Sequence, residues 1–279
     1  MGHKLLVVVR TIVLAYVGLL VMMAGCQRQF IYYPHRASES DLLDLARGAR
    51  LEPWLGPDDE IVGWRTPAPD GNRVKNAIVV FHGNAGYALH RTYFVHGFEA
   101  IPDGDAWQVY LFEYPGYGAR PGHPSETTIK QAADDAVKQL REGPHRVFLL
   151  GESLGSGVAT YLAGKYPEDI AGLFLITPFT SLTDVGRHHY PFLPVRLLLR
   201  ERYDNVRALK DYRGPIAFLL AGRDEVIPTP LGRRLHEAYE GPKKLIVQED
   251  RTHNTLMYQS HAAWWREVAE FLLDPDRER

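Results

Sequence analysis

Residues 146–155 read RVFLLGESLG, and this stretch decides the fold. Its first five residues form a short, mainly apolar run, which is typical of a strand buried on both faces. The next five match the pattern G-x-S-x-G, and a helix-like segment follows them through Ala163. A glycine on each side relieves crowding in a sharp strand-to-helix turn, so Ser153 is predicted to present its hydroxyl at the sheet edge as a nucleophile. The alternative is a plain Gly-Ser turn that opens a helix.

On both sides of this stretch, short apolar runs alternate with helical patterns. Ser125 can cap a helix whose apolar positions recur at three- and four-residue spacing, and a last amphipathic helix is expected over about Ser260 to Leu272. The alternation predicts an α/β fold with a mostly parallel sheet covered by helices on both faces, and Glu60 to Arg65 could add an antiparallel edge. The predicted buried strands are residues 77–81, 108–112, 146–150, 171–176, 216–221 and 244–248.

A serine hydroxyl is a weak nucleophile, so it needs a base, and the base needs an acid to orient it. Strand-end loops downstream of Ser153 supply both types of group. Asp224 and Glu225 follow the strand 216–221, and His253 follows the strand 244–248. We favour His253 as the base because His236 and His261 read as parts of helices.

A glycine-rich turn, His82-Gly83-Asn84-Ala85-Gly86, follows the strand 77–81. Its backbone amides can point at a developing oxyanion, and we expect Asn84 to act there together with the amide of Leu154. The alternative is a flexible glycine turn with no ligand. His82 is interpreted as structural, because a histidine at the end of a buried strand more often packs than transfers protons.

These motifs, together with Ile31-Tyr32-Tyr33-Pro34 and Tyr114-Pro115-Gly116-Tyr117-Gly118, resemble the α/β-hydrolase superfamily, in particular its small membrane-anchored serine hydrolases. The resemblance implies the α/β-hydrolase fold with an eight-stranded sheet, and hydrolysis without a cofactor through an acyl-serine intermediate. It selects Asp224 as the acid, since the usual G-x-D-x-x-x-P spacing falls on that residue. Residues 179–212, rich in proline and arginine, break the strand-helix rhythm and are predicted to form a small cap over the sheet edge.

The expected function is therefore a serine hydrolase with the triad Ser153, Asp224 and His253, acting on a small acyl ester or thioester. A small serine peptidase of the same fold and a non-catalytic scaffold that binds acyl groups at a membrane surface are the alternatives. A metal-dependent hydrolase is disfavoured, since the 12 histidines form no H-x-x-x-H pattern and Cys26 is the only cysteine. We expect no metal site.

The N-terminus is predicted to attach the protein to a membrane. Lys4 and Arg10 precede an uncharged run from Thr11 to Ala24, which is the order of a secretory signal peptide. Residues 1–25 then end in small residues before Cys26, resembling a bacterial lipobox in which that cysteine is lipidated after cleavage. The alternative is a retained anchor helix, because counting from Leu5 gives a run of spanning length. Either form predicts a bacterial cell-envelope protein facing the periplasm or exterior.

Composition limits the remaining possibilities. With 45% hydrophobic residues and 24% charged residues, the chain is that of a globular protein, and residues 26–279 are long enough for one hydrolase domain. The formal net charge of -2 supplies no basic excess for a nucleic acid. It also argues against an electrostatic grip on anionic lipid, so the anchor or lipid alone is expected to hold the membrane.

Overall fold

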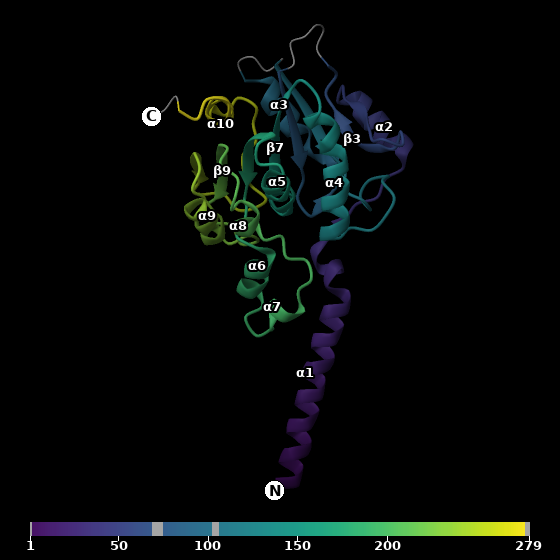
Figure 1. The fold of residues 1–279 in the computed structure, drawn as a ribbon. Helices are drawn as coiled ribbons and strands as arrows, with labels where there is room; N and C mark the ends of the chain where they lie inside the picture. The colour runs from purple at the N-terminus through teal and green to yellow at the C-terminus, as the bar shows by residue number, and fades with distance from the viewer. Residues whose placement is uncertain (1, 69–74, 102–105, 277–279) are drawn as a thin grey trace.

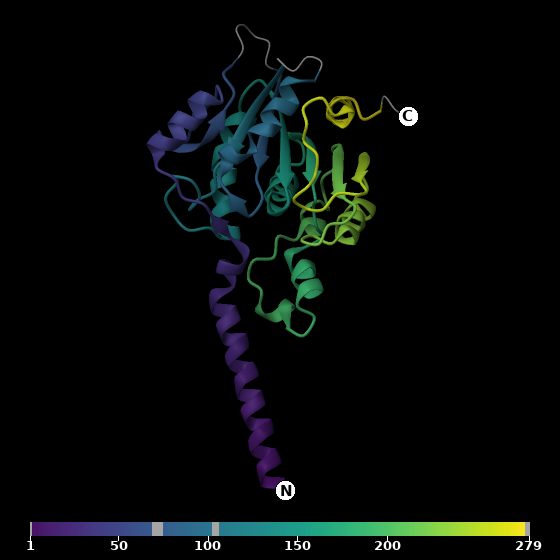
Figure 2. The same ribbon diagram turned by 180° about the vertical axis from the view of Figure 1, so that it is seen from behind.

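The computed structural model describes residues 2–68, 75–101 and 106–276, and a central sheet organises them (Figures 1 and 2). Within these residues the sheet has eight strands in the order β10-β9-β8-β7-β4-β6-β3-β2. The strands from β10 to β6 are parallel to their neighbours, whereas β3 and β2 are antiparallel. The strands are β2 (Glu52–Leu55), β3 (Ile61–Arg65), β4 (Asn76–Phe81), β6 (Trp107–Phe112), β7 (Arg146–Glu152), β8 (Ile170–Ile176), β9 (Ile216–Ala221) and β10 (Lys243–Gln248).

The six predicted parallel strands and the antiparallel edge strand are confirmed, each within two residues of the predicted bounds. The sequence analysis missed β2, the outermost strand beyond β3. It has four residues and contains Pro53, which cannot donate a ladder hydrogen bond and therefore argues against a strand. Proline is tolerated there because β2 lies at the edge of the sheet.

The central strands are mainly apolar because both of their faces are covered. In β4, Ala77, Val79 and Phe81 belong to one core cluster, while Ile78 and Val80 belong to the cluster on the other face. A strand in this position cannot show the alternating polar pattern of a half-exposed strand.

Helices cover both faces of the sheet (Figures 1 and 2). Ser125 caps α4 as predicted, because its side chain accepts a hydrogen bond from the Thr128 amide. The last helix begins at Ala263, three residues later than expected. One core cluster contains residues of α4 (Glu126–Arg141), α5 (Leu154–Lys165) and α9 (Thr229–Ala238), and the other contains residues of α2 (Glu39–Gly48), η1 (Ala88–Arg91), α3 (Thr92–Glu99) and α10 (Ala263–Leu273).

Two features project from this domain at the carboxyl end of the parallel strands. The helix α1 (Gly2–Ile31) extends away from it, and α6 (Leu182–His189) and α7 (Val195–Leu198) lie beside the part of α1 nearest the domain (Figures 1 and 2). We call residues 181–202, which include α6 and α7, the cap loop. Beyond them, α8 (Asn205–Ala208) and Tyr212 return to the core, where Tyr212 is fully buried.

α1 has 30 residues, and the mean hydropathy of its most apolar window is 2.5, so its length and composition fit membrane anchoring. The chain just after it forms a second, two-stranded sheet, in which β1 (Tyr33–Pro34) pairs in parallel with β5 (Ala85–Gly86).

Candidate functional site

Ser153 occupies the strained turn between β7 and α5. Its φ angle is 51°, in the left-handed region that non-glycine residues seldom adopt. A Cβ on Gly155 would lie 2.0 Å from the Phe81 carbonyl oxygen, and one on Gly151 would lie 2.6 Å from the Gly155 carbonyl oxygen. Both glycines are therefore required by close backbone approach. The Ser153 amide donates to the Ile176 carbonyl at 2.8 Å, which ties the turn to β8.

Asp224 and His253 are in direct contact. His253 Nδ1 lies 2.8 Å from Asp224 Oδ2, while Asp224 Oδ1 accepts hydrogen bonds from the amides of Val226 at 2.9 Å and Ile227 at 2.7 Å. The Asp224 side chain is buried. An acceptor fixed in this way favours the tautomer of His253 with the proton on Nδ1, in which Nε2 can accept a proton. Asp224, rather than Glu225, is thus the carboxylate that pairs with His253.

All three triad candidates follow the carboxyl ends of parallel strands, which meet at one edge of the sheet. Ser153 follows β7, Asp224 follows β9, and His253 follows β10. His236, by contrast, lies within α9 as expected. The expectation for His261 was wrong, because it lies in the turn before α10, which begins at Ala263.

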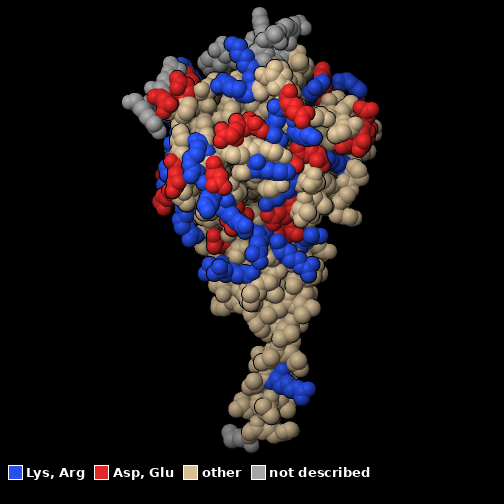
Figure 3. All heavy atoms as spheres, in the orientation of Figure 1, with Lys and Arg blue, Asp and Glu red and all other residues tan. Residues whose placement is uncertain are grey.

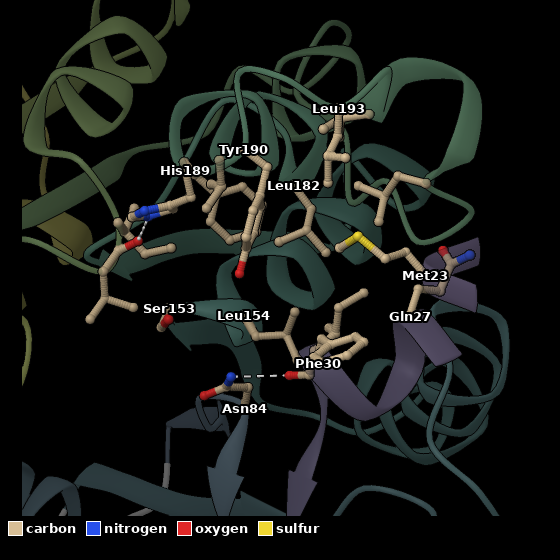
Figure 4. Close-up of a pocket in the computed structure, with 18 of the residues that line it drawn as sticks. Met23, Gln27, Phe30, Asn84, Ser153, Leu154, Leu182, His189, Tyr190 and Leu193 are labelled. Carbon is tan, nitrogen blue, oxygen red and sulfur yellow. Dashed lines mark hydrogen bonds between the residues drawn. The ribbon is translucent and has the colours of Figure 1, made fainter. Parts of the chain in front are cut away.

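The loop after β4 is held from its outer side by the chain that leaves α1. The Asn84 carbonyl accepts hydrogen bonds from the Tyr33 amide at 2.9 Å and from the Tyr117 hydroxyl at 2.7 Å. The Asn84 side chain donates to the Ile31 carbonyl at 3.0 Å (Figure 4). These contacts use the carbonyl and the side chain of Asn84, so its amide is left for another acceptor. Leu154 begins α5, where a first-turn amide has no intrahelical acceptor.

Glu152 supports the site, and the sequence analysis did not identify it. It accepts hydrogen bonds from the Gly83 amide at 3.1 Å and from Arg91 Nε at 2.8 Å. Burial alone would raise the pKa of the Glu152 carboxyl, but the Arg91 charge, the hydrogen bond from Arg91 and the Gly83 amide outweigh burial and hold that pKa below its ordinary value. One carboxylate therefore links the nucleophile turn to the loop that carries Asn84. The sequence did contain a signal for Glu152, because it is a charged residue at the end of a mainly apolar strand.

His82 is buried, and its Nδ1 lies 2.7 Å from the Gly83 carbonyl oxygen. Its ring packs against the ring of Tyr114, with 4.0 Å between centroids and a tilt of 35°, and its Nε2 lies 3.4 Å from Glu113 Oε1. These contacts agree with the structural interpretation of His82.

A pocket of about 580 Å³ opens beside Ser153 (Figure 4). Ser153, Asn84 and Leu154 contribute to one side of it. Most of the remaining walls are apolar and come from α1 and the cap loop, so the pocket suits a ligand with an apolar portion. Residues outside these two segments complete the walls: Tyr33, Phe179, Glu225, Val226 and Ile227. His189, an exposed residue at the end of α6, also lines the pocket, and its Nε2 lies 2.9 Å from the Val226 carbonyl oxygen. The wall residues from α1 and the cap loop are Met23, Gln27, Phe30, Ile31, Leu182, Val185, Gly186, His189, Tyr190, Leu193, Val195, Leu198 and Leu199.

Comparison with known proteins places this site in a family. The sequence profile described as "alpha/beta hydrolase fold" matches residues 76–269. The chain is 33% identical over 258 residues to the uncharacterized protein Rv2307c of Mycobacterium tuberculosis, covering 90% of this chain and 89% of the relative. It is 25% identical over 252 residues to a pimeloyl-[acyl-carrier protein] methyl ester esterase of Neisseria meningitidis, covering 67% of this chain and 79% of that protein.

Among solved structures, the Pyrococcus furiosus esterase Pf2001 has a TM-score of 0.64 at 16% identity, covering 87% of this chain and 97% of the esterase. A likeness at this identity concerns the fold, and it agrees with the profile match and with the strand order of the sheet. The chain therefore belongs to the α/β-hydrolase fold family, as the motifs around Ser153 predicted.

Proposed function

We propose that the protein is a serine hydrolase that cleaves carboxylic ester or thioester bonds through an acyl-serine intermediate. The observation that carries the proposal is the 2.8 Å contact between His253 Nδ1 and the buried Asp224, at the same sheet edge as the strained Ser153. The esterases among its relatives and structural neighbours support hydrolysis of an ester. The mainly apolar pocket favours an acyl group over a peptide.

In the first step, Ser153 Oγ bonds to the acyl carbon while its proton moves to His253 Nε2. Asp224 stabilises the resulting imidazolium. The amides of Asn84 and Leu154 are the proposed donors to the tetrahedral oxyanion, at roughly 3–4 kcal/mol for each donor in comparable sites. The bond from the acyl carbon to the leaving group then breaks, and the leaving group takes the proton from His253.

In the second step, His253 removes a proton from water, and the hydroxide bonds to the acyl carbon. The bond to Ser153 breaks, and the proton returns to the Ser153 oxygen. The free acid is released, and the enzyme is regenerated without a cofactor.

Labelling by a fluorophosphonate tests the nucleophile. We expect the wild type and a Ser40→Ala control to be labelled, because Ser40 is exposed on α2 and far from the turn. Ser153→Ala should not be labelled, and its turnover should fall roughly 10⁶-fold, as for a triad serine elsewhere. Labelling of Ser153→Ala at the wild-type rate would reject the mechanism. Absence of turnover by the wild type on p-nitrophenyl esters of graded length, on thioesters and on peptides would favour the non-catalytic scaffold.

We also propose that the N-terminus attaches the protein to a bacterial envelope membrane, with the domain facing the periplasm or exterior. The apolar α1 supports a retained helix, and the lipobox-like residues before Cys26 support a cleaved, lipidated form. The contact between the Tyr16 hydroxyl and the Phe192 carbonyl at 2.8 Å favours the retained helix, because cleavage before Cys26 would remove Tyr16. The intact mass of protein extracted from membranes distinguishes a full-length chain from an acylated chain that begins at Cys26.

A further inference from the structure

The end of α1 and the cap loop form one unit. Gln27 Oε1 accepts from the Arg200 amide at 2.7 Å, and Arg28 Nε lies 2.8 Å from Glu201 Oε1. The Tyr32 hydroxyl donates to Glu201 Oε2 at 2.6 Å. Glu201 and Tyr32 are buried, so the contact between them is shielded from water, whereas the Arg28 side chain is 56% exposed. The direction of α1 therefore fixes the position of the cap loop and of the pocket that it covers.

The membrane surface falls at the level of the pocket. Residues from Leu5 to Ala24 cover about 30 Å at about 1.5 Å per helical residue, which matches the hydrocarbon thickness of a bilayer. Lipid on Cys26 would place the surface at nearly the same residue. Met23 and Phe30, on either side of this level, both line the pocket.

The tip of the cap loop lies on the membrane side of the surface level near Ala24. Phe192 is bonded through its carbonyl to Tyr16, which precedes Ala24 by eight residues, or about 12 Å of helix. The side chains of Phe192 and Leu197 are exposed, at 88% and 85%. On the face drawn in Figure 3, this end of the molecule shows no acidic side chain. Residues 2–26 of α1 contain two charged residues, Lys4 and Arg10, and both are basic.

Basic side chains lie above the apolar tip, where the charged part of the molecule begins (Figure 3). The cap loop has two acidic residues, Asp184 and the buried Glu201. Its exposed cations are Arg187, Arg196, Arg200 and Arg202. An apolar tip below a basic rim is the arrangement of an element seated in a membrane interface with anionic headgroups. The net charge of -2 did not indicate this, because it averages a basic cap with acidic residues elsewhere.

We propose that the cap loop is seated in the bilayer beside α1, and that the pocket takes its substrate from the membrane, as a long-chain acyl ester of a lipid. The substrate class rests on the proposed hydrolase function. The bond cleaved is the ester bond of that lipid, and water supplies the hydroxyl of the released fatty acid and the proton of the released alcohol. A pocket of about 580 Å³, walled by α1 and the cap loop, has the size of a small-ligand site.

The position of the cap is tested without any activity. The full chain carrying Cys26→Ser and Phe192→Cys is labelled with the fluorophore NBD and reconstituted in vesicles of phosphatidylethanolamine and phosphatidylglycerol at 3:1. We expect blue-shifted emission that is quenched by lipids bearing a nitroxide on the acyl chain. The matched control places the cysteine at Leu45, which is exposed on α2 at the far side of the domain, and should show water-like emission. Water-like emission at position 192 would overturn the proposal.

The substrate route is tested with two esters that share a leaving group. Methylumbelliferyl oleate is dissolved in the same vesicles, and methylumbelliferyl acetate is supplied in water. We expect Phe192→Ser with Leu197→Ser to lower turnover of the oleate about tenfold, since apolar side chains no longer favour the bilayer. Neither residue lines the pocket, so acetate turnover should stay within twofold. The control pair Leu45→Ser and Leu55→Ser, also exposed, should leave both rates unchanged.

Each other outcome has a defined meaning. An equal loss on both esters, or no loss on the oleate, would overturn membrane delivery of the substrate. If the wild type hydrolyses neither ester while the labelled Phe192→Cys chain shows the expected blue-shifted, quenched emission, the hydrolase function and the substrate class fail, and the seating of the cap in the bilayer stands.

Discussion

The nucleophile turn and the cap loop both border the pocket, yet they are built in opposite ways. At the turn, Gly155 leaves no room for a methyl group against the backbone of β4, and the largely buried Glu152–Arg91 pair ties the end of β7 to η1. In the cap loop, the side chains of Phe192 and Leu197 are exposed, and polar contacts tie the loop to α1 and to Glu126 of α4. Reacting groups must be held within a fraction of an ångström, so they belong on the rigid sheet. A surface that meets a membrane can instead be an irregular loop.

The largest expected difference between the two regions concerns the acid of the proposed triad. Asp224→Asn should reduce kcat by roughly 10⁴-fold, because an amide no longer holds His253 in the reactive tautomer. Asp250→Asn is the matched control, since Asp250 is also an aspartate near β10 but is exposed and paired with Arg223. Steady-state kinetics on a soluble ester measures both. A loss of less than tenfold in Asp224→Asn would remove this residue from the triad.

The next effect tests whether the rigid side depends on its buried ion pair. Glu152→Gln leaves the Arg91 charge buried without a partner and should lower the free energy of unfolding by about 3–5 kcal/mol. Urea unfolding in detergent measures it. Glu240→Gln, which breaks the exposed pair with Arg213, is the control and should change it by less than about 0.5 kcal/mol.

The same pair predicts the direction of a pH effect. The folded pKa of Glu152 lies below its ordinary value of 4.5, so its stabilisation is complete above 4.5 and is lost as the pH falls from there through the folded pKa. The wild type should therefore lose more stability between pH 7 and pH 4 than Glu152→Gln does. Equal losses of stability in the two proteins would show that acid does not destabilise the protein through the Glu152–Arg91 pair.

The smallest effect compares one added methyl group in each region. Gly155→Ala should lower the free energy of unfolding by at least about 1–3 kcal/mol, since the new Cβ meets a backbone carbonyl that cannot turn away. Gly186→Ala in α6 should change it by less than about 1 kcal/mol, because its Cβ meets a Val195 methyl group and alanine favours a helix. Similar losses in the two variants would contradict the contrast between a rigid turn and an adaptable cap.

Much of the fold was predictable from local patterns. The stretches 77–81, 147–150 and 216–221 are continuous apolar runs because a strand covered on both faces admits little else. The edge strand β2 was not predictable, because Pro53 and a length of four residues hide a strand whose pairing is decided by β3.

For the candidate site, the sequence by itself determined which groups could react, since Ser153, Asp224 and His253 each follow a recognisable strand. Only the tertiary structure decided what surrounds them. Arg91 meets Glu152 across 61 residues, and Arg28 meets Glu201 across 173. The periodicity of apolar residues indicates which face of a strand or helix is buried. It carries no information about which residues far apart in the sequence will contact each other. The walls of the pocket, half from α1 and the cap loop, were therefore settled only when the chain folded.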